Sequence, residues 1–153
     1  MNRRQTSGLS LAINKTMASL KNGRPLFEKN AVAEFTIKVA NTLEERQAAF
    51  ALGYQVYLSK GFISPNPHEM LIHSYDSNDE TVVLIVQDKQ KNIAGSVTIV
   101  FDVNSRLPAE KIYREELKAL RDSGTKMAEL SRLVISPDYR NSKDILVLLF
   151  NYA

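Results

Sequence analysis

The chain has 153 residues, 44% hydrophobic and 24% charged, which are the proportions of one ordinary globular domain with a single core. It contains no Cys, which excludes disulfide frameworks, thiolate metal sites, iron–sulfur clusters and Cys nucleophiles. The net charge of +3 comes from residues 1–33, which hold six basic residues and one acidic residue, whereas residues 34–153 hold 14 basic and 16 acidic residues. A slightly acidic domain argues against nucleic-acid binding, which needs a basic stripe on the folded surface.

Residues 1–33 form a basic leader. Leu9, Ile13, Met17 and Leu20 recur at helical spacing, which predicts a marginal amphipathic helix in a solvated terminus. Polar residues interrupt this stretch, so it makes a poor signal-peptide core. The longest apolar runs of the whole chain are far shorter than the roughly 20 residues of a membrane-spanning helix. We therefore expect a cytoplasmic protein without a transmembrane segment.

The periodic pattern of a folded domain begins at residue 34. Apolar and polar residues alternate over 35–39, which predicts a strand with one buried face. Thr42 and Glu45 have capping-box spacing, and the apolar periodicity that follows predicts a helix over 43–59, which Gly61 can end.

The middle of the chain combines a long loop with a hairpin. Residues 62–80 are rich in Pro, Asn, Asp and Ser, and such a long loop in a compact domain is often functional. The β-branched runs 81–86 and 93–101 are separated by six polar residues, which predicts an antiparallel hairpin. Gly95 within the second run indicates a bulge.

The last third predicts helix, strand and helix. One helix runs from Pro108 to Gly124 with an apolar stripe, a central strand covers 127–135, and a strongly apolar helix covers 144–152. The stripe consists of Ile112, Tyr113, Leu117 and Leu120. Because the last helix must bury several faces and reaches the final residue without a stop signal, we expect the chain to be cut short within its domain.

Three polar residues stand out in the strand over 127–135: Glu129, Ser131 and Arg132. Charged groups in a strand are costly to bury unless they are paired, so a structural salt bridge and a catalytic cleft are both open interpretations.

The strand-turn-helix over 134–146 offers free N–H groups and a positive dipole end, which suit a pyrophosphate. Arg140 adds a charge there, but the segment has no glycine.

The order and spacing of these elements resemble the GNAT-related acyltransferases, and within them the acyl-homoserine-lactone synthases and the N-acyl amino acid synthases. The resemblance implies an α/β (α+β) fold with a mixed, mostly antiparallel sheet flanked by helices, over residues 34–153 and without its C-terminal strands. Arginines typical of lactone synthases are replaced here at Gly53 or Gln55 and at Thr98, so the N-acyl amino acid synthases are the closer match. The segments that carry the resemblance are Leu52 to Tyr57, Tyr75–Asp76, Ile93 to Val97, Glu129 to Val134 and Ser136 to Arg140.

The resemblance implies an N-acyltransferase that moves an acyl group from the phosphopantetheine thioester of acyl carrier protein or acyl-CoA to the amine of an amino acid or similar small acceptor. It uses no metal, and His68 and His73 are expected to be solvated. An acetyl-CoA dependent N-acetyltransferase and a non-catalytic GNAT-like binding module are the alternatives. A wide apolar cavity would favour the long-chain activity over acetyl transfer. The 153 residues alone are expected to lack turnover.

The resemblance also implies site residues. Glu129 is the expected base, with Asp76 in reserve, while Ser131 and Arg132 bind the acceptor, Arg132 through the carboxylate of the amino acid, which suits a guanidinium fork. Since Glu129 and Arg132 would face opposite sides of a regular strand, a bulge between them is predicted if both serve one cleft. The donor is expected to be held by backbone N–H groups and charges of Leu133, Val134, Ile135, Arg140, Ser142, Lys143 and Asp144.

Overall fold

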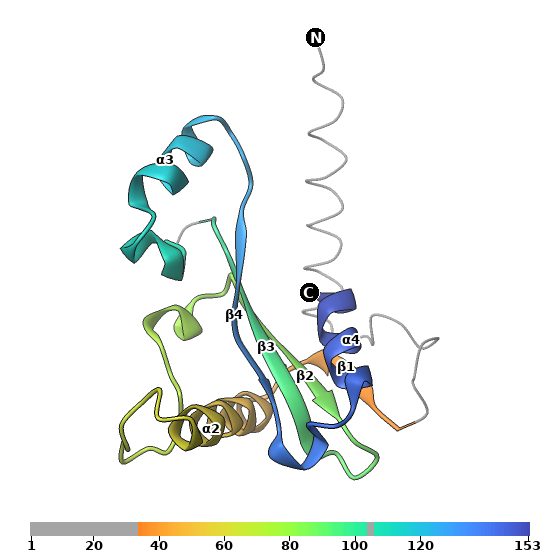
Figure 1. Ribbon diagram of the computed structural model, residues 1–153. Coiled ribbons are helices and arrows are strands. Elements are labelled where there is room, and N and C mark those ends of the chain that lie inside the picture. The colour runs from red at the N-terminus through yellow and green to blue at the C-terminus, as the bar shows by residue number, and fades with distance from the viewer. Residues whose placement is uncertain (1–33, 104–105) are drawn as a thin grey trace.

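The computed structural model describes residues 34–103 and 106–153 (Figure 1). The basic leader and its predicted helix lie outside the described residues. Four strands form one antiparallel sheet in the order β1-β2-β3-β4, which confirms the predicted α+β architecture. The strands are β1 (Thr36–Val39), β2 (Thr81–Gln87), β3 (Ile93–Phe101) and β4 (Ala128–Ile135).

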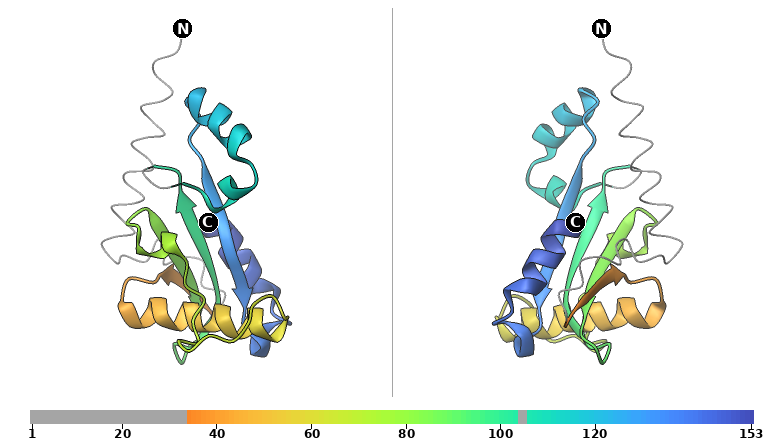
Figure 2. Two further views of the ribbon diagram at one scale, coloured as in Figure 1. Left: turned by 90° about the vertical axis from the view of Figure 1, so that its left-hand side faces the viewer. Right: turned by 90° about the vertical axis from the view of Figure 1, so that its right-hand side faces the viewer.

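Helices cover both faces of this sheet. Helix α2 lies across one face and α4 across the other, while α3 stands at the far end of β4 (Figures 1 and 2). The α-helices are α2 (Leu43–Ser59), α3 (Arg114–Asp122) and α4 (Lys143–Tyr152). Short 3-10 helices are η1 (Ser74–Ser77), η2 (Pro108–Lys111) and η3 (Pro137–Tyr139).

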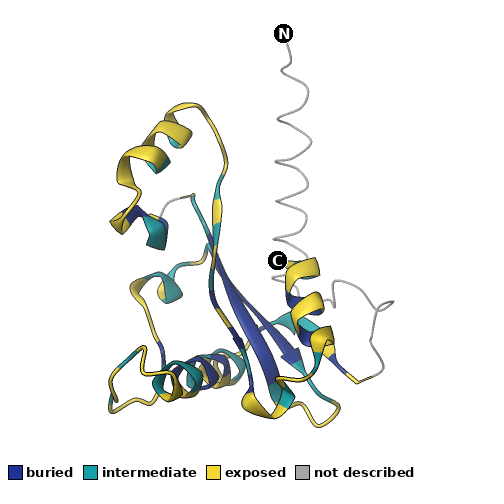
Figure 3. Ribbon diagram, in the orientation of Figure 1, coloured by how far each residue is buried: buried dark blue, intermediate teal, exposed yellow. Residues whose placement is uncertain are grey.

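Side chains of β2 point alternately to the two faces of the sheet and so contribute to two cores. Leu84 and its neighbours at even positions pack with Ile145 and Leu149 of α4, whereas Val83 and Ile85 pack with Ala49 of α2. Side chains of successive strand residues point to opposite faces, so a wholly apolar strand is covered on both faces of the sheet. The central strands are accordingly buried along most of their length (Figure 3).

The predicted capping box of α2 is confirmed. The hydroxyl of Thr42 accepts the backbone N–H of Glu45 at 3.2 Å, and the carboxylate of Glu45 accepts the N–H of Thr42 at 3.4 Å. The helix ends at Ser59, as its pattern predicts, and Gly61 follows with φ of +70°. Local chemistry therefore fixes both ends of α2.

The prediction of one continuous helix from Pro108 to Gly124 is wrong. The segment divides into η2 and α3, and Ile112 and Tyr113 at the break are exposed, as is Leu120. Ion pairs rather than apolar packing hold α3 against the rest of the domain, because Arg121 donates to both Asp102 and Glu110. The apolar stripe is therefore not a core face in the described residues (Figure 3).

Two further expectations differ from the structure. Strand β4, predicted to be central, lies at the edge of the described sheet and pairs with β3. Helix α4, expected to bury several faces, buries Ile145, Leu148 and Leu149 while Leu146, Val147 and Phe150 are exposed. Among the described residues, no helix combines the length and apolarity required to cross a membrane.

Candidate active site

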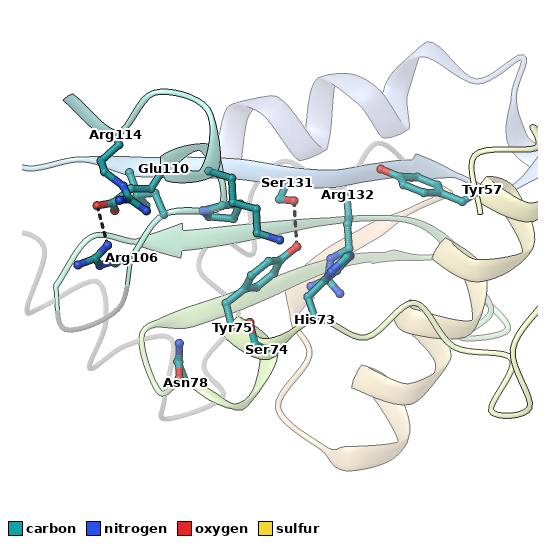
Figure 4. Close-up of a pocket in the computed structure, with 13 residues that line it drawn as sticks. Tyr57, His73, Ser74, Tyr75, Asn78, Arg106, Glu110, Arg114, Ser131 and Arg132 are labelled. Carbon is teal, nitrogen blue, oxygen red and sulfur yellow. Dashed lines mark hydrogen bonds and ion pairs between the residues drawn. The ribbon is translucent and has the colours of Figure 1, made fainter. Parts of the chain in front are cut away.

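A cavity of about 600 Å³ lies on the face of β4 that carries its polar residues. Its walls come from α2, η1, the segment 106–114 and β4, which are far apart in the sequence (Figure 4). Leu107 and Pro108 give it an apolar side, and the other lining residues carry polar or charged groups. A concave site with a few convergent polar groups is the usual form of a small-molecule site.

A bulge in β4 brings consecutive polar residues to this cavity. Thr98 pairs with Ser131 and Ser96 pairs with Val134, so two residues of β4, 132 and 133, stand opposite one residue of β3. Arg132 has φ of +51°, a left-handed conformation that is uncommon outside glycine. Ser131 and Arg132 both line the cavity as a result. The predicted irregularity is present, but it includes Arg132 instead of lying before it.

The guanidinium of Arg132 is buried and almost fully engaged. Its Nη1 donates to the backbone oxygen of Leu71 and to Asp76, both at 2.8 Å. Its Nη2 donates to the hydroxyl of Thr98 at 2.8 Å and to the second oxygen of Asp76. Only Nε lacks a partner among the described residues. Asp76 and Arg132 therefore form a buried bidentate ion pair.

Aromatic rings surround this ion pair. The guanidinium carbon of Arg132 lies 5.0 Å from the ring centre of Phe50 and 5.2 Å from that of Tyr75, within the range of cation–π attraction. The ring of His73 stacks on Tyr75 at 5.1 Å. The hydroxyl of Tyr75 lies 3.2 Å from that of Ser131 (Figure 4). Ser131 is thus tied to η1 through Tyr75.

The titration of two rings reflects this environment. Burial raises the pKa of Tyr75, so its hydroxyl stays protonated at neutral pH. Burial, followed by the charges of Arg132 and Lys111, lowers the pKa of His73. A neutral imidazole and a neutral phenol therefore face the cavity at pH 7.

Glu129 lies on the same side of β4 as Ser131, because the two residues are separated by two positions. One of its carboxylate oxygens accepts the backbone N–H of Ala109 at 2.7 Å. This bond uses one oxygen and holds η2 against β4. Glu129 is half-buried and pairs with neither Arg132 nor Asp76. The structure thus separates it from the ion pair but keeps it near the cavity wall.

The residues predicted to hold the donor lie at the other end of β4. Leu133, Val134 and Ile135 belong to the open edge of the described sheet, and η3 leads from them to the start of α4. Ser142 is the N-cap of α4 and makes no side-chain cap bond. Arg140, Lys143 and Asp144 are exposed around that turn.

Sequence reasoning missed the cations of the cavity wall and the rings beside the ion pair. Tyr75 carried part of the family resemblance, but nothing in its pattern indicated contact with Ser131. Lys111 and Arg114 have the ordinary spacing of solvated helix residues, and only the fold shows that they line a cavity. Within the described residues, there is no group of three or more His, Asp or Glu side chains that could hold a metal ion.

Comparison with known proteins gives two findings. A solved structure described as FeeM, an N-acyl amino acid synthase from uncultured soil microbes, matches with a TM-score of 0.65 and 19% identity. The match covers 80% of this chain and 64% of that one, so the chain spans less than two thirds of that relative. No curated protein gave a match. The family model for the N-acyl amino acid synthase FeeM matches residues 48–153, and the chain therefore belongs to the FeeM family of N-acyl amino acid synthases.

Proposed function

We propose that the protein transfers an acyl group from a phosphopantetheine thioester, carried by coenzyme A or acyl carrier protein, to the amine of an amino acid or similar small acceptor. One observation carries this proposal beyond family membership. The bulge of β4 directs Ser131 and Arg132 into a cavity beside an open strand edge, with Glu129 on the same side of the strand. A thioester on that edge would meet an acceptor in that cavity.

The reaction needs few groups from the protein. The acceptor ammonium must lose a proton before its nitrogen attacks the thioester carbonyl, and the tetrahedral oxyanion then collapses and releases the thiolate. Glu129 is the proposed base, either directly or through a water molecule. Its second carboxylate oxygen is not used by the bond to Ala109, which leaves an acceptor for this proton.

The donor is proposed to lie along β4. Backbone N–H groups of Leu133 and Ile135 on the open edge would hold the pantetheine arm and the developing oxyanion, whereas the N–H of Val134 faces β3, as does that of Ser136, which donates to Ala94. Arg140 and Lys143 at the start of α4 would meet the phosphate, with the N–H groups of the first helical turn. This order places the phosphate at the C-terminal end of β4 and the thioester toward Glu129.

Asp76 is proposed to act through Arg132 instead of on the substrate. Both of its carboxylate oxygens accept from the guanidinium, and one also accepts the N–H of His73 at 2.6 Å. Because both oxygens face the guanidinium, this carboxylate is poorly placed to take a proton from the acceptor. Asp76 would thus fix the bulge, and Ser131 on the bulge would contact the acceptor.

The test is product formation by the full chain. Acyl-CoA thioesters from acetyl to long-chain, and acyl carrier protein loaded with the same acids, are incubated with a mixture of amino acids. N-acyl amino acids are then detected by mass spectrometry and free thiol by a colorimetric reagent. We expect N-acyl amino acids as the products. Exclusive acetylation would identify an N-acetyltransferase, and no product from any pair would reject the enzymatic proposal.

Replacement of Glu129 by Gln is the first prediction. We expect kcat to fall by about 10²- to 10⁴-fold, the usual contribution of a general base. The amide oxygen of Gln can still accept the N–H of Ala109, so the variant should keep the stability of the parent protein. Steady-state kinetics and thermal unfolding measure the two effects separately.

Glu115→Gln is the matched control, because Glu115 is an exposed carboxylate of α3 outside the cavity lining. It should keep the parent kcat. Unchanged turnover in Glu129→Gln would remove Glu129 from the role of base. A loss of turnover together with a loss of stability would instead make it a positioning residue for η2.

A further inference from the structure

We infer that Lys111 and Arg114, on the η2–α3 wall of the cavity, bind the carboxylate of the acceptor and set its selectivity for acids over uncharged amines. The inference rests on the proposed function, since it names the acceptor subsite of the same cavity. It replaces the role that sequence reasoning gave to Arg132.

Arg132 cannot offer a carboxylate its bidentate fork. Both terminal nitrogens already donate to Asp76, and further bonds go to Leu71 and Thr98. The charge of Arg132 is also neutralised by that carboxylate within a buried pair. Only the N–H of Nε remains without a partner among the described residues. A carboxylate entering the cavity must therefore find its charge partner elsewhere.

The η2–α3 wall provides unneutralised positive charge. The side chains of Lys111 and Arg114 make no hydrogen bond and no ion pair within 4 Å among the described residues, and both line the cavity. Glu110, the carboxylate that lines the same wall, accepts from Arg121 at 2.6 Å, but it shares that cation with Asp102 and also lies in the field of Arg106 and Arg114. The contact between Arg106 and Glu110 is longer, at 3.7 Å. Since Arg106, Lys111 and Arg114 line this wall against Glu110 alone, the wall carries an excess of cations.

These cations stand on a fixed support. The carboxylate of Glu129 accepts the N–H of Ala109 within η2, and Arg121 ties Glu110 to Asp102, the residue after β3. Lys111 and Arg114 thus lie in a segment that is held at Ala109, Glu110 and Arg121. A fixed pair of cations binds an anion at less cost in side-chain and backbone ordering than two cations on a free loop.

The anion could come from either substrate, because the donor also carries phosphate. The turn between β4 and α4, with Arg140 and Lys143, already offers a place for that phosphate at the opposite end of β4. The acceptor carboxylate is therefore the better match for the η2–α3 wall. The experiment separates the two sources.

Binding of a product analogue tests the inference without turnover. N-octanoylglycine and its uncharged amide, N-octanoylglycinamide, are titrated into the full chain by isothermal calorimetry. We expect the acid to bind at least tenfold more tightly than the amide in 50 mM salt, since hydrogen bonds between charged groups contribute that much. The preference should shrink in 500 mM salt. The variant K111Q/R114Q should bind both compounds equally.

The control variant K118Q/K126Q removes two charges that are exposed and lie outside the cavity lining. It should keep the preference for the acid. Equal binding of acid and amide by the parent chain, no binding of the acid, or an unchanged preference in K111Q/R114Q would each overturn the inference. So would weaker binding of coenzyme A in K111Q/R114Q, since it would assign the cations to the donor phosphate. None of these results depends on turnover, so the proposed function is judged separately by product formation.

Discussion

Arg132 combines two unfavourable features, a buried charge and a left-handed backbone conformation. A buried guanidinium is strongly unfavourable unless it is paired and hydrogen-bonded, and the chain meets this demand with Asp76, Thr98 and the backbone of Leu71. The left-handed backbone of Arg132 is a further cost. The ion pair therefore stabilises a local conformation that is unfavourable by itself, and this conformation turns Ser131 and Arg132 toward one cavity.

Asp76→Asn tests this dependence. The substitution leaves a buried positive charge without its counter-charge, so we expect the free energy of unfolding to fall by about 3–5 kcal/mol. Urea denaturation followed by circular dichroism measures the change. Asp122→Asn is the control, because the ion pair of Asp122 with Lys118 is exposed and such pairs contribute little. Equal small effects of the two substitutions would show that the buried pair does not hold the bulge.

The sequence identified Glu129, Ser131 and Arg132 as unusual because polar residues in an apolar strand need an explanation. It could not assign their partners. Arg132 pairs with Asp76, 56 positions away, and Glu129 bonds a backbone N–H instead of a side chain. Such pairings depend on how the loop over 62–80 folds back on the sheet, which no local pattern encodes.

At the level of elements, prediction succeeded where local chemistry decides and failed where tertiary contacts decide. The bounds of α2 follow from its capping box and from Gly61 beyond its last residue. The segment from Pro108 to Gly124 also has a start and a stop signal, but ion pairs of Arg121 and the bond from Ala109 to Glu129 divide it into η2 and α3. Tertiary contacts override intrinsic helix preference in such segments.

Gly95, inside β3, shows how closely α4 packs on the sheet. A Cβ at Gly95 would lie 2.7 Å from Cγ2 of Ile145 and 3.1 Å from the backbone oxygen of Val134. We expect Gly95→Ala to lower the free energy of unfolding by about 1–3 kcal/mol through overpacking against α4. In the background of Ile145→Ala, which removes the clashing atom, the same substitution should cost less. Thermal and urea unfolding of the four proteins give this coupling.

Gly53→Ala in α2 provides the opposite expectation. A Cβ there would meet Leu71 at 3.5 Å, an ordinary contact, and alanine is a better helix former than glycine by about 0.5–1 kcal/mol. The variant should therefore be more stable than the parent chain. A destabilised Gly53→Ala, or a Gly95→Ala that costs the same with and without Ile145, would contradict the packing of the helices on the sheet.

The cavity is a property of the whole described fold. Its lining runs from Tyr57 in α2 to Arg132 in β4, and each segment that reaches it reads, in sequence, as an ordinary helix, loop or strand. What the sequence could supply was the polar strand and the family resemblance. The charge of the cavity emerges only when η1, η2 and β4 meet, because Asp76 is then neutralised by Arg132, 56 positions away.

The titration of His73 reports this combined field. Burial, then the charges of Arg132 and Lys111, hold its pKa below the ordinary value of 6.5, against the opposing effect of Asp76. Since the unfolded chain binds the proton more readily, stability contributed by neutral His73 is present above pH 6.5 and is lost as the pH falls through the lowered pKa. We expect NMR titration of the His73 ring to give a pKa below 6.5.

Lys111→Gln should raise the pKa of His73 toward its ordinary value, because it removes one of the charges that oppose protonation, whereas Lys118→Gln should leave it unchanged. Saturation with N-octanoylglycine should also raise it, since a bound carboxylate adds negative charge to the cavity, and the amide should have a smaller effect. A pKa at or above 6.5 in the parent chain, or equal shifts with acid and amide, would show that the segments around the cavity do not create a common positive field.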